Sequence, residues 1–187
     1  MKAGKKRDRL FEPVQKRERV YAGSYLNLDR LTIRLPNGKK AFREIVNVRN
    51  AVAVLPVDKD GTAYLVRQHR PAIKRTIIEI PAGVVDSKRE SLEKCARREC
   101  EEETGIIPGR LRRLLTYSHA EGYSTGFITL FLATNLRHTG KLNLDQTEFL
   151  EQVKMPYAKL LRMIEKGGIV DSKTILCAML SRRYLPF

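Results

Sequence analysis

Residues 91–104 place three carboxylates where an amphipathic helix would normally carry apolar side chains. The segment is typical of a helix, with Gly105 following as its C-terminal stop. Ser91 can cap its start, and so can Ser87, which has Glu90 three residues further on. At 3.6 residues per turn, the inward stripe consists of Leu92, Cys95, Ala96 and Cys100.

Glutamates overlap this stripe. Glu99, Glu102 and Glu103 fall within about 100° of arc on the same side, whereas Glu101 points the opposite way, to solvent. Like charges at these spacings repel one another, and an unpaired charge at the edge of a core is costly. Something positive must therefore compensate for the three carboxylates.

Two kinds of compensation fit the pattern. Carboxylate oxygens favour a hard cation, Mg²⁺ or Mn²⁺, over zinc, and such a site binds phosphate oxygens and activates water. The alternative is an acidic face in solvent, with Arg97 and Arg98 as its neighbours. The overlap with the apolar stripe favours the metal.

Residues 98–106, Arg-Glu-Cys-Glu-Glu-Glu-Thr-Gly-Ile, resemble the second half of the Nudix box. Glu90 and Gly83 match the glutamate and the opening glycine of that pattern. The chain departs from the pattern by one extra residue between Gly83 and Glu90, and by Cys100 in place of an aliphatic residue. The extra residue lies in the loop and leaves the helix spacing unchanged.

Three further stretches, residues 43–46, 65–71 and 78–83, are similar to the ADP-ribose pyrophosphatase branch of this family. The resemblance covers roughly residues 18–185. It implies an α+β fold, a Nudix-type α/β/α sandwich with a small N-terminal antiparallel β-sheet domain. It also implies a homodimer in which two chains share each active site.

From their terminal position and basic composition, residues 1–17 are expected to form a basic, flexible tail. The resemblance implies that residues 18–48 form the dimerising sheet and residues 49–187 the Nudix hydrolase domain. Around the Asn37-Gly38 pair we expect a hairpin of strands 31–35 and 41–46. A second hairpin is expected from strands 51–55 and 63–67, and closing helices over 156–167 and 172–184.

The resemblance also assigns roles to residues. Glu99, Glu102 and Glu103 would be metal ligands together with the backbone carbonyl of Ala82, and Arg98 would pair with a glutamate of the box. The substrate would meet Arg70 at a phosphate, and Arg43 and Glu44 at the nucleotide or terminal ribose. For Arg70 and Arg43, an exposed charge at a strand end is an equally weighted alternative.

The expected reaction is hydrolysis of a pyrophosphate bond. Divalent ions neutralise the phosphates and activate a water, and a glutamate, from among Glu102, Glu103 and Glu148, takes its proton. Glu148 lies in the loop from which this branch often supplies such a glutamate, although a solvated loop acid is the alternative. ADP-ribose-preferring members usually carry a proline where this chain has residues 118–122, Ser-His-Ala-Glu-Gly, so we expect a broader class, the nucleoside diphosphate sugars.

The charge of the chain allows other readings. The formal net charge is +15, of which +5 lies in residues 1–19 and the rest is scattered. A role at RNA 5′ ends is therefore the second hypothesis, although nucleic acid is not the expected partner, and a non-catalytic regulatory module is the third.

The sequence Gly-Tyr-Ser-Thr-Gly at 122–126 matches a serine-hydrolase elbow, but a strand follows it where the elbow needs a helix.

Three cysteines, at positions 95, 100 and 177, make neither a disulfide framework nor a zinc motif. They are typical of reduced thiols inside a cell. The sequence has no apolar run long enough for a membrane span and no signal-peptide pattern at its start. We therefore expect a cytoplasmic protein with no membrane partner.

Overall fold

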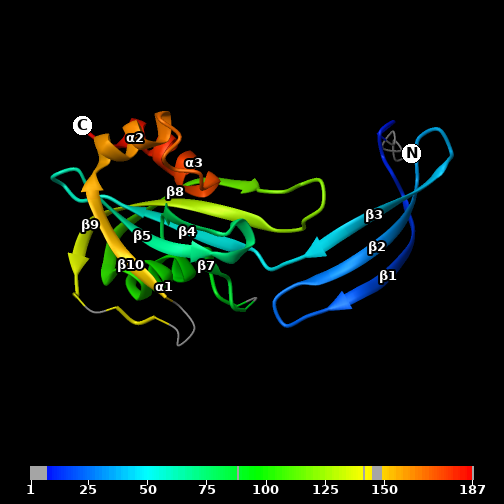
Figure 1. Cartoon of the computed structure of the whole chain (residues 1–187), viewed down its shortest axis with the longest axis horizontal. Coiled ribbons are helices and arrows are strands. Elements are labelled where there is room, and N and C mark those ends of the chain that lie inside the picture. The colour runs from blue at the N-terminus through cyan, green and yellow to red at the C-terminus, as the bar shows by residue number, and fades with distance from the viewer. Residues whose placement is uncertain (1–7, 88, 141, 145–148, 187) are drawn as a thin grey trace, which may run out of the picture. The chain divides into compact units, whose positions relative to one another are not determined.

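The computed structural model describes residues 8–87, 89–140, 142–144 and 149–186. The chain divides into two compact units (Figure 1). The N-terminal unit comprises residues 1–49 and 118–126, and the main unit comprises residues 50–117 and 127–187.

The N-terminal unit is built on an antiparallel sheet of three strands, β1 (Val14–Ala22), β2 (Asn27–Arg34) and β3 (Lys40–Asn47), in that order. The expected hairpin at Asn37-Gly38 is confirmed as β2 and β3, with Gly38 in the left-handed region at φ 84°. Strand β1 begins at Val14, inside the segment that we assigned to the tail. The basic composition of residues 1–17 did not predict a strand there. Strand β1 pairs with β2 through backbone groups, and this pairing does not depend on side-chain charge.

The main unit contains two sheets. One has the order β7-β4-β9-β8, and the other has the order β10-β5-β6. Their strands are β4 (Ala51–Pro56), β5 (Thr62–Arg70), β6 (Arg75–Glu79), β7 (Ala82–Val84), β8 (Ile106–Ser118), β9 (Phe127–His138) and β10 (Leu150–Pro156).

The expected hairpin of strands 51–55 and 63–67 is wrong. Strands β4 and β5 do follow one another across the turn at residues 58–61, but they lie in different sheets. Strand β4 pairs antiparallel with β7 on one side and parallel with β9 on the other. Because both of its edges are taken, β5 pairs instead with β6 and β10.

The helices cover both faces of the sheet that contains β4. Val52 and Val54 pack in one cluster with Cys95 and Cys100 of α1 (Leu92–Thr104). The alternate residues of β4 pack in another cluster with α2 (Tyr157–Glu165) and α3 (Ser172–Ser181). Figure 1 shows α1 on the opposite side of the strands from α2 and α3. The α+β fold with an α/β/α sandwich is confirmed.

Short 3₁₀ helices, η1 (Pro71–Ile73) and η2 (Arg182–Tyr184), complete the elements. Across the described ranges, no helix has both the length and the apolar character that crossing a membrane would require.

At the start of α1, the Ser91 hydroxyl accepts a hydrogen bond from the Lys94 amide at 3.2 Å, which decides between the two candidate caps. Gly105 ends the helix in the left-handed conformation, with φ 64°.

Candidate active site

The inner face of α1 carries two buried carboxylates. Glu99 and Glu103 are 8% and 5% exposed, and Glu102 is partly exposed. Glu101 is exposed to solvent, as expected. The overlap of the glutamates with the apolar stripe is therefore real, and these charges sit at the edge of the core.

The Ala82-Gly83 segment lies directly over these glutamates. The Ala82 amide donates to Glu103 Oε2 at 3.3 Å, and a methyl group at Gly83 would lie 2.0 Å from the Glu99 carboxylate. No side chain larger than hydrogen fits at Gly83 while Glu99 stays in place. The structure thus brings together three of the four predicted metal ligands, namely Ala82, Glu99 and Glu103, with Glu102 one residue along the helix.

Arg98 compensates for part of this negative charge. Its Nη1 donates to Glu99 Oε1 at 2.7 Å and to Glu102 Oε2 at 3.1 Å, and its Nε donates to Glu90 Oε1 at 3.1 Å. Burial opposes the arginine's charge, but the hydrogen bond to Glu90 and the charge of Glu99 outweigh it and raise the pKa of Arg98. The hydrogen bond from Arg98 lowers the pKa of Glu90. The expected pairing of Arg98 with a glutamate of the box is present.

The fit of a metal can be judged from this chemistry. The donors are all oxygens, which suits a hard divalent cation, and Gly83 leaves room beside Glu99 that any other residue would fill. Among the described residues, no three His, Cys, Asp or Glu side chains are arranged around a common metal position. Arg98 supplies the compensating charge in this arrangement, so a cation would have to share Glu99 and Glu102 with it.

Arg70 is held by a buried carboxylate that the sequence analysis did not single out. Its Nε and Nη2 donate to Glu79 at 2.8 and 2.9 Å, and Glu79 is 1% exposed. Burial opposes the charge, but the hydrogen bonds and charge of Glu79, with a contribution from Glu103, raise the pKa of Arg70. Arg70 is therefore a fixed, partly exposed cation in the electrostatic range of the α1 glutamates. The sequence contained a signal for this buried carboxylate, because Glu79 is a charged residue within the apolar strand Ile-Ile-Glu-Ile at 77–80.

The other predicted residues lie elsewhere. Arg43 and Glu44 are exposed on β3 of the N-terminal unit, where Arg43 pairs with Glu12 at 3.1 Å and Glu44 with Arg30 at 3.6 Å. Glu148 lies outside the described residues. Strand β9 begins at Phe127, directly after the Gly-Tyr-Ser-Thr-Gly stretch, so the helix that a nucleophile elbow needs is not there.

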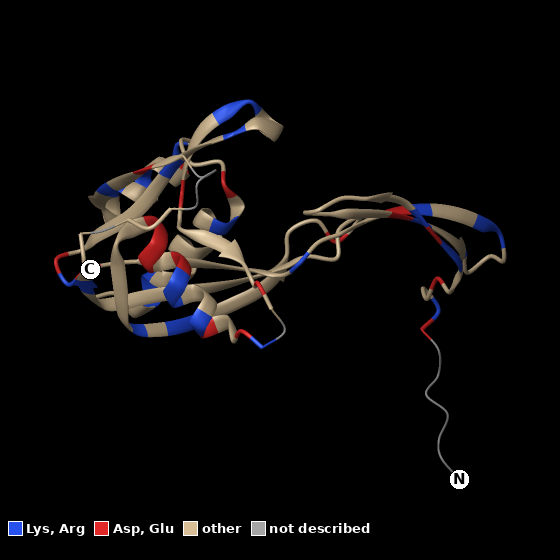
Figure 2. Ribbon diagram, turned by 90° about the horizontal axis from the view of Figure 1, so that it is seen from below, with Lys and Arg blue, Asp and Glu red and all other residues tan. Residues whose placement is uncertain are grey.

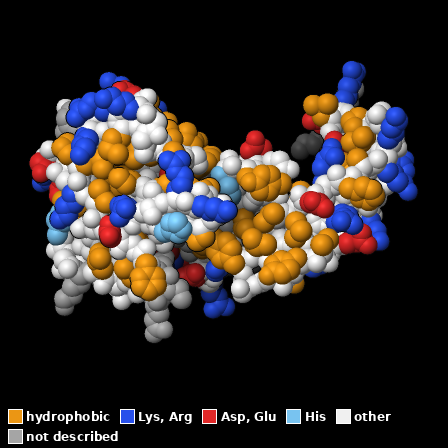
Figure 3. All heavy atoms as spheres, viewed as in Figure 1, with side chains coloured by type: hydrophobic (Ala, Val, Ile, Leu, Met, Phe, Trp, Pro, Cys, Tyr) orange, Lys and Arg blue, Asp and Glu red, His pale blue; other side chains and the backbone are white. Residues whose placement is uncertain are grey.

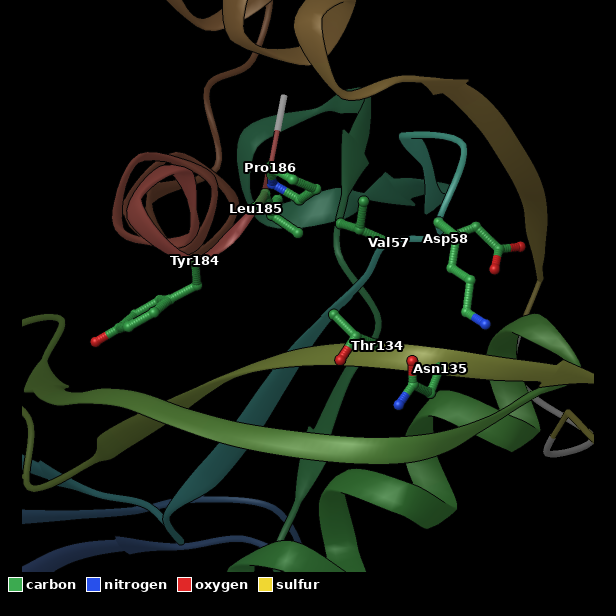
Figure 4. Close-up of a pocket in the computed structure, with 8 residues that line it drawn as sticks. Val57, Asp58, Thr134, Asn135, Tyr184, Leu185 and Pro186 are labelled. Atoms are coloured by element: carbon green, nitrogen blue, oxygen red, sulfur yellow. The ribbon is translucent and has the colours of Figure 1, made fainter.

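A pocket of about 540 Å³ adjoins the glutamates and is lined by Arg98, Glu101, Glu102, Thr139 and Asn143. A second pocket, of about 200 Å³, lies between the C-terminal segment and β9 (Figure 4). Its labelled lining includes Asp58, Asn135 and Tyr184, and none of the predicted site residues. Of these two pockets, the first is the one that contains a predicted metal ligand, Glu102, together with Arg98, which pairs with it.

Comparison with known proteins gives a consistent family. Residues 47–175 match the NUDIX domain model. The chain is 36% identical to ADP-ribose pyrophosphatase of Bacillus subtilis, with 88% of this chain and 89% of that protein covered. It is 32% identical to methanol dehydrogenase activator of Bacillus methanolicus (90% and 91% covered). It is 28% identical to GDP-mannose pyrophosphatase of Escherichia coli (86% and 90% covered).

Among solved structures, the crystal structure of ADP compounds hydrolase matches with a TM-score of 0.83. The match covers 92% of this chain and 93% of that one at 23% sequence identity, and it shows the shared fold. The domain match extends over more than half of the chain and includes the glutamates of α1 and the Ala82-Gly83 segment. This chain belongs to the Nudix family.

Proposed function

We propose that this protein hydrolyses the pyrophosphate bond of ADP-ribose or related nucleoside diphosphate sugars, giving a nucleoside monophosphate and a sugar phosphate. One observation carries the proposal: buried Glu99 and Glu103 lie beneath the Ala82-Gly83 segment inside a Nudix domain. The names of the relatives, pyrophosphatases of ADP-ribose and GDP-mannose, support this substrate class over RNA 5′ ends.

The reaction would need a divalent cation, Mg²⁺ or Mn²⁺. Glu99, Glu102, Glu103 and the Ala82 carbonyl would hold it. When bound, such an ion neutralises phosphate charge and lowers the pKa of a coordinated water. Arg98 and Glu90 hold the helix and the loop together, so the ligands would already be close to one another before the ion binds.

The remaining roles fall to residues that bind substrate or move protons. Arg70, fixed by Glu79 and partly exposed, would bind a phosphate. A glutamate, from among Glu102, Glu103 and Glu148, would take the proton of the attacking water. Arg43 and Glu44 remain the candidates for contact with the nucleotide or the terminal ribose.

We also propose a homodimer formed through the N-terminal unit, residues 18–48 in particular. All nine residues of β1 are exposed, and Phe42 on β3 is 66% exposed. Figure 3 shows hydrophobic side chains among the charged ones over these strands. A sheet with this much exposed apolar surface is typical of a protein interface. Sedimentation velocity should give twice the mass of 21.4 kDa, and Phe42→Asp should shift the protein toward the monomer.

Over the described residues, the basic side chains are spread over both units (Figure 2). The names of the relatives favour a nucleotide-sugar substrate over a nucleic-acid partner. A cytoplasmic location stays a prediction from the reduced cysteines, all three of which are free.

The deciding experiment is Mg²⁺-dependent hydrolysis of a panel of ADP-ribose, ADP-sugars, GDP-sugars, UDP-sugars and capped RNA, with products separated by chromatography. Turnover of one or more of the sugar nucleotides, lost in EDTA, is expected. Turnover of capped RNA alone would refute the proposed substrate class.

A further inference from the structure

The N-terminal end of α3 contacts Glu79, the carboxylate that binds the Arg70 guanidinium. Lys173 Nζ donates to Oε2 of Glu79, the same carboxylate that holds Arg70. Glu79 is 1% exposed and therefore accepts hydrogen bonds from two cations in a nearly dry setting. Three donors on one buried carboxylate fix the plane of that carboxylate.

That plane in turn fixes Arg70. Two of the three guanidinium nitrogens, Nε and Nη2, are bound to Glu79. Among the described residues, the third nitrogen, Nη1, has no hydrogen-bond partner, and the side chain is 42% exposed. The outward edge of Arg70 is therefore what the protein offers to a ligand, and Glu79 sets the direction in which it points.

Lys173 is itself locked in place. Its side chain is 11% exposed, and its Nζ also bonds to Asp171 Oδ1 at 2.9 Å. The other oxygen of Asp171 caps α3 by accepting from the Thr174 amide at 3.0 Å. The Thr174 hydroxyl accepts from the Ile80 amide at 2.8 Å, next to the segment that carries Ala82. The N-terminal end of α3 thus contacts both the carboxylate that holds Arg70 and the segment that leads into β7, which lies over the glutamates.

We propose that Lys173 is a positioning residue for the substrate phosphate, acting on Arg70 through Glu79. Without Lys173, the Glu79 side chain could rotate together with Arg70, and Arg70 would be the single cation that neutralises the Glu79 carboxylate. With Lys173 bound to Oε2, the carboxylate is fixed and shared, so Arg70 can turn its outer edge to an anion. This inference rests on the proposed function, because it assigns the phosphate contact to Arg70.

A double-mutant cycle tests the connection. The variants are Lys173→Met, Glu79→Gln and the two combined, with Lys159→Met on the exposed side of α2 as the control for loss of one lysine. Lys173→Met leaves Glu79 paired with Arg70, and position 79 carries a neutral glutamine in Glu79→Gln and in the combined variant, so none of these three leaves Glu79 as an unpaired buried charge. KM and kcat are measured well below each melting temperature with the best nucleotide sugar of the panel.

We expect Lys173→Met to raise KM about tenfold, the effect of weakening one charge-assisted contact, with a smaller change in kcat. The combined variant should be no worse than Glu79→Gln, because Lys173 then has no carboxylate through which to act. Lys159→Met should leave both constants unchanged. Loss of folded protein would lower the apparent kcat and leave KM as it was.

Three results would overturn the inference. If the two single effects multiply in the combined variant, Lys173 acts independently of Glu79. If Lys173→Met leaves KM unchanged in an active enzyme, it has no positioning role, and the proposed function still stands. If the unaltered protein hydrolyses no member of the panel, both proposals fail together.

Discussion

Gly83 lies so close to Glu99 that an added methyl group would stand 2.0 Å from the carboxylate carbon. The contact joins β7 to the helix that carries the glutamates. It explains why a glycine is needed at this position on grounds of space alone, since no positive φ is involved there.

Gly83→Ala should therefore weaken metal binding more than it weakens the fold. Glu99 can move its flexible end away from the new methyl group, but it then leaves the place from which it would bind a cation. We expect the Mg²⁺ concentration for half-maximal activity to rise about tenfold or more, with little change in melting temperature. Gly122→Ala is the matched control, because an added methyl group there meets nothing within 4 Å. Equal Mg²⁺ dependence in both variants would contradict the placement of Glu99 at the metal.

Glu103→Gln should abolish most turnover while the fold remains. The glutamine oxygen can still accept the hydrogen bond from Ala82, so the packing is kept and only the charge is lost. A loss of at least about 100-fold in kcat/KM is expected for a metal ligand, and circular dichroism should be unchanged. Glu93→Gln, on the exposed first turn of α1, is the control. Full activity of Glu103→Gln would refute its assignment to the metal.

Glu90→Gln should change how stability depends on pH. The hydrogen bond from Arg98 lowers the pKa of Glu90 below its ordinary value of 4.5, so the unfolded state binds the proton more readily than the folded state. The stabilisation is thus present above about pH 4.5 and is lost as the pH falls through the lower folded pKa.

The free energy of unfolding should therefore differ between the unaltered protein and Glu90→Gln by about 1 kcal/mol at pH 7. At pH 3 the difference should be smaller. Urea titrations at the two pH values measure it, and a difference that grows on acidification would show that Arg98 does not stabilise the Glu90 carboxylate.

What the sequence predicted well is what depends on neighbours along the chain. The helix predicted over 91–104, with Ser91 as a candidate cap and Gly105 as its end, depends on residues a few positions apart. The structure confirms it as α1. The inward position of Glu99 and Glu103 follows from helical periodicity in the same way. The sequence pattern of the Nudix box predicted the family, which the domain match bears out.

What it missed depends on contacts between distant segments. Strand β5 was paired with its neighbour in sequence, but both edges of β4 were already taken by β7 and β9. The contact of Lys173 with Glu79 joins residues 94 positions apart. No local pattern marks a lysine at the start of one helix as the partner of a glutamate at the end of a strand.

The three cysteines should resist modification in the folded protein. Cys95, Cys100 and Cys177 are each 0% exposed, and burial raises the pKa of each thiol to about 12. At pH 8 only about one thiol in 10⁴ would then be ionised, and the thiolate is the reactive form. Ellman's reagent should label no cysteine of the native protein within minutes and all three in guanidinium chloride, with glutathione as the reactive control. Rapid labelling of one thiol under native conditions would show that its helix, α1 or α3, opens readily from the sheet.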